Sequence, residues 1–489
     1  MKISKLSRLS ILMLGLAGLL TVSENAFSQN KCQGGGMSLS FDLSKTNNTH
    51  IENNNTYIVV LGIDPATQKH AYVKFNNGNR VGTLVDIADI NMNGKNYGIS
   101  LSELIPSSGG MAQACIPHLT SGRIYISFGN TLDIPTDKDT LTPKQPDVNN
   151  PQTTTNGTLF DKVEFNYSTR GETVINPTGV DFIAIPYTIQ QAGHEYGHFG
   201  GLDAVIKNMK TIICRAASET IDSPECAQRW NHSEWSSLVV YNSVNALMRV
   251  NAPGRFGDRF SGYFTNYINE LSQYYSSSIN RSIKIDLNEL NKGIWSGTFE
   301  PNSQTLVFSR DGGLGTETLS YNLGSPQASN SIFMGAQAPF NNKNAVDATI
   351  ARDLTSAIVS GMLMRKESAF IGKDFFDAQG NPIFRNKQQM QELLKYYFNN
   401  VDHSVDYIVN QCGTTKDAPC VNVYSEAMHA LSFDKNIDHP QDSYLNSYAF
   451  SYDDFLGMDG TNTQTDAKPA TVVIGDMKNR KIPHVDLYY

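Results

Sequence analysis

The chain has 489 residues, 18% of them charged, which is enough sequence for two or three domains or one large composite domain. Its formal net charge of −8 argues against nucleic acid as a partner, because binding phosphates requires a basic surface. A neutral ligand is compatible with this charge.

The N-terminus has the pattern of a secretory signal peptide. Basic residues (Lys2, Lys5 and Arg8) precede an apolar run over 11–22, and the small residues Ala26 and Ser28 suit a cleavage site. The alternative, a signal anchor, needs about 20 apolar residues, more than this run contains. We therefore expect residues 1–28 to be removed and the protein to be secreted, to the extracellular space or the periplasm. No later segment is apolar and long enough to suggest a membrane partner.

Six cysteines follow the signal peptide. An even number in an oxidising compartment predicts disulfide bonds. The expected pairs are Cys214–Cys226 and Cys412–Cys420, each close in sequence, and then Cys32–Cys115. Because spacing alone does not decide connectivity, buried free thiols remain the alternative.

The region after the signal peptide is predicted to form β-strands. Short runs rich in β-branched and aromatic residues lie at 57–62, 71–75 and 122–128. A polar stretch at 135–157, rich in Pro, Thr, Asn and Asp, is predicted to be an exposed loop. Two further strands are expected over 162–167 and 180–189.

Helical periodicity follows these strands. Apolar residues recur at steps of three and four over 202–216, 264–271, 346–362 and 390–397. We interpret each apolar stripe as packed core. Strand-like sequence returns at 447–452 and 470–474, so the order is β, then α/β, then β. One economical arrangement places both ends of the chain in a single β domain.

Two motifs compete for the chemistry, and the first is His194-Glu195-Tyr196-Gly197-His198. On a helix, an H-E-x-x-H motif places two imidazoles on one face, where both can bind zinc while the glutamate acts as a general base. The motif would then belong to a metallopeptidase.

The sequence around this motif disfavours a helix. Several glycines surround it, and glycine costs about 1 kcal/mol at an interior helix position. The extended motif would also need histidine at position 204, which is Ala204, and Glu219 is a poor match for a downstream ligand. We therefore predict a glycine-rich loop over 191–201 that leads into a helix near Leu202. A zinc peptidase remains the less favoured hypothesis.

The second motif is a pair of acidic residues on successive strands. In the alternating segment 162–167, Glu164 and Asn166 point to one face, with Ser168 after them, and Val163 and Phe165 point to the other. A carboxylate, an amide and a hydroxyl in a row suit a sugar-binding surface.

Asp181 is the second acid of this pair. It is a single acid within the apolar run 179–186, and a lone charge there is costly to bury unless it is paired or faces a wet cleft. If the two strands are neighbours, Glu164 and Asp181 share one groove. The alternative is that both are ordinary surface carboxylates.

The chain resembles glycoside hydrolase family 64, the β-1,3-glucanases that share a barrel with thaumatin-like proteins. The central resemblance lies in Val163-Glu164-Phe165-Asn166-Tyr167, then Val180-Asp181-Phe182 and Pro186. Three other stretches agree in order: Ser121-Gly-Arg-Ile-Tyr-Ile-Ser127, Val421-Asn-Val-Tyr-Ser-Glu-Ala-Met-His429 and Tyr448-Ala-Phe-Ser-Tyr-Asp-Asp454. The segment from Arg215 to Trp235, with the glycine-rich segment 194–201, looks unlike the usual pattern.

The resemblance implies a mainly β fold with α/β elements, in which a thaumatin-like β-barrel or sandwich domain and a mixed α/β domain flank a wide groove. We expect the β domain over 29–190, completed by 440–489, and the α/β domain over 191–439. It further implies an inverting hydrolase of β-1,3-glucan that needs no metal or other cofactor, with Glu164 as general acid and Asp181 as general base. A monomer is expected. The rival from another class is a non-catalytic glucan-binding protein on the same scaffold.

Further residues are candidates for contacting the glucan. Asn166, Ser168, Asp453 and Asp454 are the candidate substrate-binding residues, although the two aspartates also suit a turn. The three tryptophans, Trp230, Trp235 and Trp295, are expected to pack in the core rather than to stack on sugar rings.

Overall fold

The computed structural model describes residues 36–361 with gaps, chiefly 88–97 and 149–156, together with residues 382–385, 421–436, 443–444 and 467–482 and the single residues 32, 363 and 464. The signal-peptide segment, the predicted helix at 390–397, the predicted strand at 447–452 and the pair Cys412 and Cys420 lie outside these residues. None of the helices in the described part of the chain is long and apolar enough to span a bilayer.

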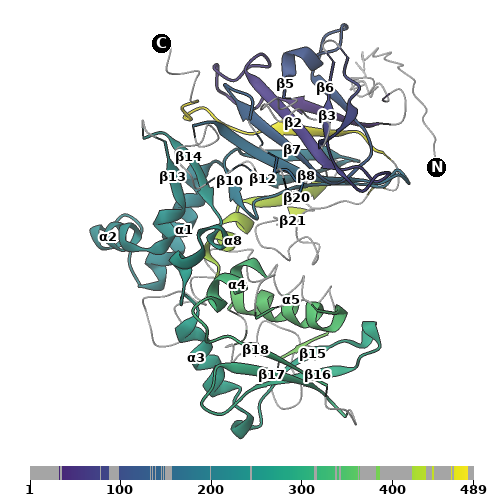
Figure 1. Ribbon diagram of the computed structural model, residues 1–489. Helices are drawn as coiled ribbons and strands as arrows, with labels where there is room; N and C mark the ends of the chain where they lie inside the picture. Colours follow the sequence, from purple (N-terminus) through teal and green to yellow (C-terminus); the bar gives the residue numbers. More distant parts are fainter. Residues whose placement is uncertain are drawn as a thin grey trace, which may run out of the picture.

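A seven-stranded sheet brings together strands from both ends of the chain (Figure 1). Its strands, in spatial order, are β21 (Ser443–Tyr444), β20 (Ser432–Asn436), β12 (His194–His198), β11 (Tyr187–Gln191), β22 (Ala470–Ile474), β1 (Met37–Asp42) and β6 (Ala112–Ile116). β1 and β22 pair in parallel, with Leu39 opposite Ala470. The sheet therefore extends beyond residue 190, where we expected the β domain to end, because β12 and β20 both belong to it. The division of the chain into domains stays a prediction.

A second sheet lies against the first. It contains β4 (Thr83–Asp86), β3 (His70–Lys74), β2 (Thr56–Ile63), β7 (Leu119–Phe128), β8 (Leu159–Tyr167) and β9 (Thr173–Pro177) in that order, and β5 (Ile99–Ser100) pairs with β2. Buried side chains from both sheets form one core, with Leu39 and Val472 from the first sheet and Val163 from the second. Because each sheet buries one face against the other, the two form a sandwich.

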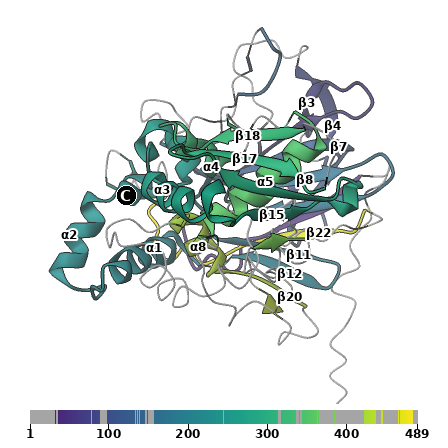
Figure 2. The ribbon, with the colours of Figure 1, turned by 90° about the horizontal axis from the view of Figure 1, so that it is seen from below.

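The remaining elements form a second core. A three-stranded sheet consists of β10 (Phe182–Ile183), β14 (Leu247–Asn251) and β13 (Val239–Tyr241), and a five-stranded sheet consists of β18 (Thr318–Asn322), β17 (Thr305–Arg310), β16 (Ile294–Phe299), β15 (Ile283–Asp286) and β19 (Ile383–Phe384). The α-helices are α1 (Leu202–Ala216), α2 (Pro224–His232), α3 (Thr265–Tyr274), α4 (Ala328–Met334), α5 (Ala345–Val359) and α8 (Val423–His429). The 3₁₀ helices of this part are η4 (Glu234–Leu238), η5 (Pro253–Phe260), η6 (Ser277–Ile279) and η7 (Asn288–Leu290), whereas η3 (Leu101–Leu104) packs in the sandwich core. Figures 1 and 2 show α4 and α5 lying across the five-stranded sheet, on the side that faces the sandwich.

Most predicted elements appear where the patterns placed them. α1 begins at Leu202, as predicted, and α5 covers most of the apolar stripe predicted over 346–362. The prediction of a single strand over 180–189 is wrong, because the structure has two separate strands there, β10 and β11. The backbone N–H groups of Ala184 and Ile185 instead donate to the buried carboxylate of Asp161, so they are not available to a strand partner.

Two of the expected disulfides are confirmed. Cys32 is bonded to Cys115, which ties the first described residue to β6, and Cys214 is bonded to Cys226, which joins α1 to α2. No free thiol occurs among the described residues.

Candidate active site

Three side chains on one face of β8 run from buried to exposed. Alternation along the strand places Lys162, Glu164 and Asn166 on the same face. Lys162 is 1% exposed, the Glu164 side chain is 21% exposed, and Asn166 is exposed to solvent. Val163 and Phe165, on the other face, are buried in the sandwich core, as the alternation predicted. Glu164 therefore lies at the boundary between a buried charged cluster and the surface.

Glu164 contacts two cations. Arg123 lies directly opposite it on β7, and its Nε donates to Glu164 Oε1 over 3.3 Å. The ammonium group of Lys162 donates to the same oxygen over 3.4 Å. On the other neighbouring strand, β9, Asn176 lies opposite Glu164. The described donors to this carboxylate therefore come from β7 and from β8 itself.

Asp181 lies just before β10 and is 8% exposed. Its Oδ2 accepts a hydrogen bond from Lys162 Nζ, and its Oδ1 accepts one from Arg255 Nε over 2.7 Å and a second from Arg255 Nη2. Burial alone would raise the pKa of Asp181, but the positive charges of Lys162 and Arg255 outweigh it and lower the pKa to about 2. Asp181 is therefore ionised across the ordinary pH range.

Asp161 fixes the segment that carries Asp181 to the start of β8. Its Oδ2 accepts hydrogen bonds from Ala184 N at 2.7 Å and Ile185 N at 2.9 Å. Burial raises the pKa of Asp161 to about 7, against the backbone hydrogen bonds that favour its charged form. On the far side, Asp181 O accepts a hydrogen bond from Ala252 N, next to β14. These contacts hold Asp181 over the buried end of β8.

The structure therefore brings Glu164 and Asp181 together through Lys162, which contacts both. Ser168 is placed differently from expectation: it lies in the β8–β9 turn, and its Oγ accepts hydrogen bonds from the backbone N of Arg170 and Glu172. Asp453 and Asp454 lie outside the described residues.

Sequence reasoning missed three cations of this cluster, Arg123, Lys162 and Arg255. Lys162 had a usable signal, because it stands two residues before Glu164 on an alternating strand and so shares its face. Arg123 and Arg255 reach the site only through tertiary pairing, the latter from 74 residues away in sequence.

The H-E-x-x-H segment forms β12, an inner strand of the first sheet. Our expectation of a loop there was wrong, because residues 432–436 pair with the segment along its length. A strand rises about 3.3 Å per residue, so the Cα atoms of His194 and His198 lie roughly 13 Å apart. In a helix, the same two residues would be separated by only about one turn. This separation is incompatible with the zinc geometry that the motif needs.

The side chains of β12 have structural partners. Glu195 Oε1 accepts from Thr188 Oγ1 at 3.0 Å, and Glu195 Oε2 pairs with Lys435 at 2.9 Å. Burial lowers the pKa of His198 to about 4, so its ring is neutral at neutral pH. The Nδ1 atom of His194 lies 3.4 Å from Oδ1 of Asp434. In the described residues, no cluster of three or more His, Cys, Asp or Glu side chains is arranged to hold a metal ion.

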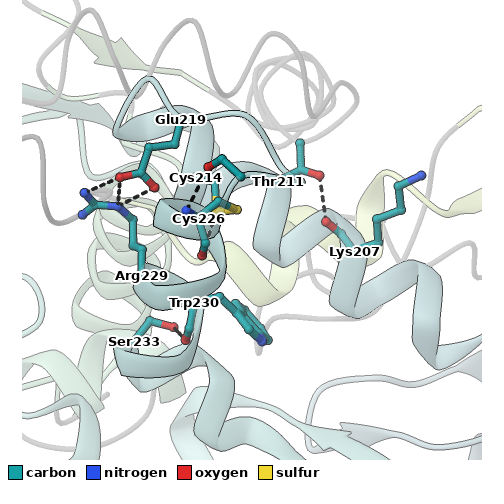
Figure 3. The surroundings of a disulfide bond; sticks show 9 residues. Lys207, Thr211, Cys214, Glu219, Cys226, Arg229, Trp230 and Ser233 are labelled. Carbon is teal, nitrogen blue, oxygen red and sulfur yellow. Dashed lines mark hydrogen bonds and ion pairs between the residues drawn. A yellow bond between two sulfur atoms is a disulfide. The ribbon is translucent and has the colours of Figure 1, made fainter.

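The segment with the second disulfide borders a separate cavity. In Figure 3, Arg229 faces Glu219 beside the Cys214–Cys226 bond, and two of the nitrogens of this arginine donate to the carboxylate over 2.8–3.1 Å. The cavity has a volume of about 670 Å³ and is lined by this pair and by residues of α2, η4 and 261–266, but not by Glu164 or Asp181. Trp235 and Trp295 are buried, which confirms their expected place in the core.

Comparisons with known proteins agree with this architecture. No curated protein matches the chain. A crystal structure of a β-1,3-glucanase domain from Clostridium beijerinckii matches with 22% identity and a TM-score of 0.59, over 90% of this chain and 98% of that one. A laminaripentaose-producing β-1,3-glucanase, crystallised with laminaritetraose, matches with 15% identity and a TM-score of 0.61, over 91% of this chain and 99% of that one. At these identities the likeness shows the fold, which is mainly β-sheet with few helices.

A family model supplies the assignment that the structural likeness alone does not. The model described as Beta-1,3-glucanase matches residues 38–380, which is more than half of the chain. This range includes Glu164 and Asp181. The resemblance inferred from the sequence is thereby confirmed, and the chain belongs to glycoside hydrolase family 64, the β-1,3-glucanase family.

Proposed function

We propose that the protein is a secreted enzyme that hydrolyses β-1,3-glucan by inversion, with Glu164 as general acid and Asp181 as general base, on a thaumatin-like scaffold. One observation carries the proposal: in a chain of family 64, two carboxylates converge on a single buried ammonium, and one of them lies at the edge of the exposed surface. The partly exposed carboxylate can reach the glycosidic oxygen of a bound polymer.

The charge environment suits Asp181 to the role of base. A general base must be ionised when substrate binds, and Lys162 and Arg255 keep Asp181 ionised despite its burial. In the reaction it would take a proton from the water that attacks the anomeric carbon. Its low proton affinity is offset by the charge that develops on this water in the transition state.

The exposure of Glu164 suits it to the role of acid. Bound glucan would cover the exposed part of its side chain and bring a glycosidic oxygen against the carboxyl group. After it gives its proton to the leaving oxygen, Arg123 and Lys162 would stabilise the resulting carboxylate. Asn166, exposed on the same face, is our candidate for a hydrogen bond to a neighbouring sugar.

The anomer released first tests the stereochemistry. Because Lys162 Nζ contacts both carboxylates, their nearest oxygens lie within about two hydrogen-bond lengths, roughly 6 Å. Inverting enzymes hold their carboxyl groups about 6.5–9.5 Å apart and retaining enzymes about 5–5.5 Å, so the nearest oxygens lie closer here than is usual for inversion. The family resemblance, and not this separation, supports inversion, and the anomer is the deciding observable. We expect proton NMR in the first minutes of hydrolysis to show the α-anomer. A β-anomer in those spectra would establish retention and exclude Asp181 as a water-activating base.

Substitutions test the two roles separately. Glu164→Gln and Asp181→Asn preserve shape but remove proton transfer, so each should lower kcat on a linear β-1,3-glucan by about 10²–10⁴-fold. The loss in Glu164→Gln should shrink on a substrate with a good leaving group, whereas the loss in Asp181→Asn should not. Azide should rescue Asp181→Ala more than Glu164→Ala. The control is Glu172→Gln, an exposed acid in the turn after β8, which should keep full activity.

Reducing-sugar release separates the enzyme from its non-catalytic rival. If the wild-type protein binds linear β-1,3-glucan but releases no reducing ends, a glucan-binding protein is the better description. If it cleaves a peptide substrate and loses that activity with a chelator, the peptidase hypothesis is restored against the strand geometry of β12.

Secretion is supported by the two disulfide bonds, since such bonds persist in oxidising compartments. N-terminal sequencing of protein recovered from the culture medium or periplasm should begin after Ser28. Full-length protein retained in the cytoplasm would contradict this proposal.

A further inference from the structure

Lys162 has an unusual position for a lysine. It is 1% exposed on the second sheet, and its ammonium group contacts both Asp181 and Glu164. A buried ammonium is costly unless paired, so its two carboxylate partners account for its presence there. The contacts also make Lys162 a direct physical link between the proposed base and the proposed acid.

Inversion moves a negative charge between these two partners. At the start Asp181 is ionised and Glu164 carries a proton. As the glycosidic bond breaks, the attacking water forms the new C–O bond and gives a proton to Asp181, while Glu164 gives its proton to the leaving oxygen. At the end Asp181 is neutral and Glu164 is ionised, so one negative charge has disappeared from one carboxylate and appeared on the other.

We infer that Lys162 is a positioning residue for this reaction, and that it balances the negative charge on Asp181 before bond cleavage and on Glu164 after it, without leaving its place between them. This inference rests on the proposed function. Because the cation is already within reach of both carboxylates, no solvent or side chain has to reorganise as the charge moves, which is the condition for electrostatic catalysis in a buried site.

The neighbouring charged groups divide between the two carboxylates. Arg255, on η5, contacts Asp181, and Arg123, on β7, contacts Glu164. In the described part of the chain, the other titratable groups that act on Lys162 or on its partners include four more. These are Tyr125, opposite Lys162 on β7, Asp161, adjacent on β8, Tyr187 on β11 and Tyr424 on α8. Arg255 therefore provides a comparison for Lys162, as a cation that pairs with the proposed base.

The pH dependence of kcat/KM tests the inference. The acidic limb of this profile reports the pKa of the general base in the free enzyme, and the alkaline limb reports the pKa of the general acid. Lys162→Met removes a cation from both carboxylates, so both limbs should move to higher pH, the acidic limb by about 1–3 units. Arg255→Met should move mainly the acidic limb. Lys162→Arg should keep both limbs near their wild-type positions, even if kcat falls because the longer group fits poorly.

A purely structural role would give a different result. If Lys162→Met folds and binds glucan but loses rate equally at every pH, with both limbs unmoved, the inference is wrong. Should Lys162→Met fail to fold, Lys162→Gln, which keeps a polar end group, serves the same comparison. The control is Lys435→Met, which breaks an ion pair with Glu195 in the first sheet and should leave the profile unchanged. Failure of the wild-type protein to hydrolyse glucan would instead overturn the proposed function.

Discussion

Removing one charge from the Asp181–Lys162 pair should destabilise the protein about as much as removing both. The two single variants are Asp181→Asn and Lys162→Met, and the third is their combination. Each single change leaves a buried charge without its main partner, whereas the double change removes both charges together.

The size of the effect follows from the burial of the pair and from its remaining contacts. Asp181 is 8% exposed and Lys162 is 1% exposed, and breaking a buried pair by removing one partner costs about 3–5 kcal/mol. Each survivor keeps a second contact, Arg255 for Asp181 and Glu164 for Lys162, so we expect the lower end, about 3 kcal/mol for each single variant. The double variant should lose a similar amount rather than the sum, a coupling of about 2–3 kcal/mol.

Denaturant unfolding followed by tryptophan fluorescence measures these free energies, provided that the slope with denaturant is the same in all four proteins. Activity measured in parallel should fall in both variants that carry Asp181→Asn, because these lack the proposed base whatever their stability. If the loss in the double variant equals the sum of the single losses, the two residues do not interact energetically, and our description of the buried pair is refuted.

Three other predictions concern parts of the structure away from this pair. Replacing Cys214 and Cys226 with serine opens a link across 12 residues and should lower the free energy of unfolding by about 3 kcal/mol without changing kcat, as denaturant curves and initial rates will show. Gly197→Ala should cost about 1–3 kcal/mol, because Gly197 has a φ of +126° and an added Cβ would lie 2.7 Å from Tyr187 O; an unchanged unfolding midpoint would contradict this. Burial raises the pKa of the Glu426 carboxyl group well above its usual value, so protonation of this group stabilises the fold. This stabilisation is complete below the pKa that Glu426 has in the unfolded chain, and it is lost as the pH rises through the higher pKa of the folded protein. Glu426→Met should remove this decline, and unfolding measured from pH 4 to pH 8 should show a flatter dependence than in the wild type.

The sequence was most informative where a local pattern coincides with burial. Alternation over 162–167 predicted a strand and the correct faces, because Val163 enters the core while Glu164 lies at the surface boundary. The apolar spacing from Leu202 predicted α1 for the same reason, since one face of that helix is buried. Family resemblance then singled out the two acids that β8 and the segment before β10 bring together.

Long-range pairing accounts for what the sequence could not show. The glycines around 194–198 looked like a loop because the strands that pair with this segment, β11 and β20, cannot be recognised from the segment itself. The division at 184–186 depends on the carboxylate of Asp161, about twenty residues earlier, and the contact of Arg255 with Asp181 depends on the course of η5. These are tertiary interactions that override local propensity.

The position of β22 between β11 and β1 has a consequence for biosynthesis. Residues 470–474 are synthesised after all the other described strands of the first sheet, and until they arrive this sheet consists of two separate pieces, β1 with β6 on one side and β11, β12, β20 and β21 on the other. Each piece presents an unpaired strand edge, which favours association with other chains over folding. A chain that lacks β22 therefore cannot complete its sandwich, and a premature stop before residue 470 should yield an aggregating fragment rather than a shortened, folded protein.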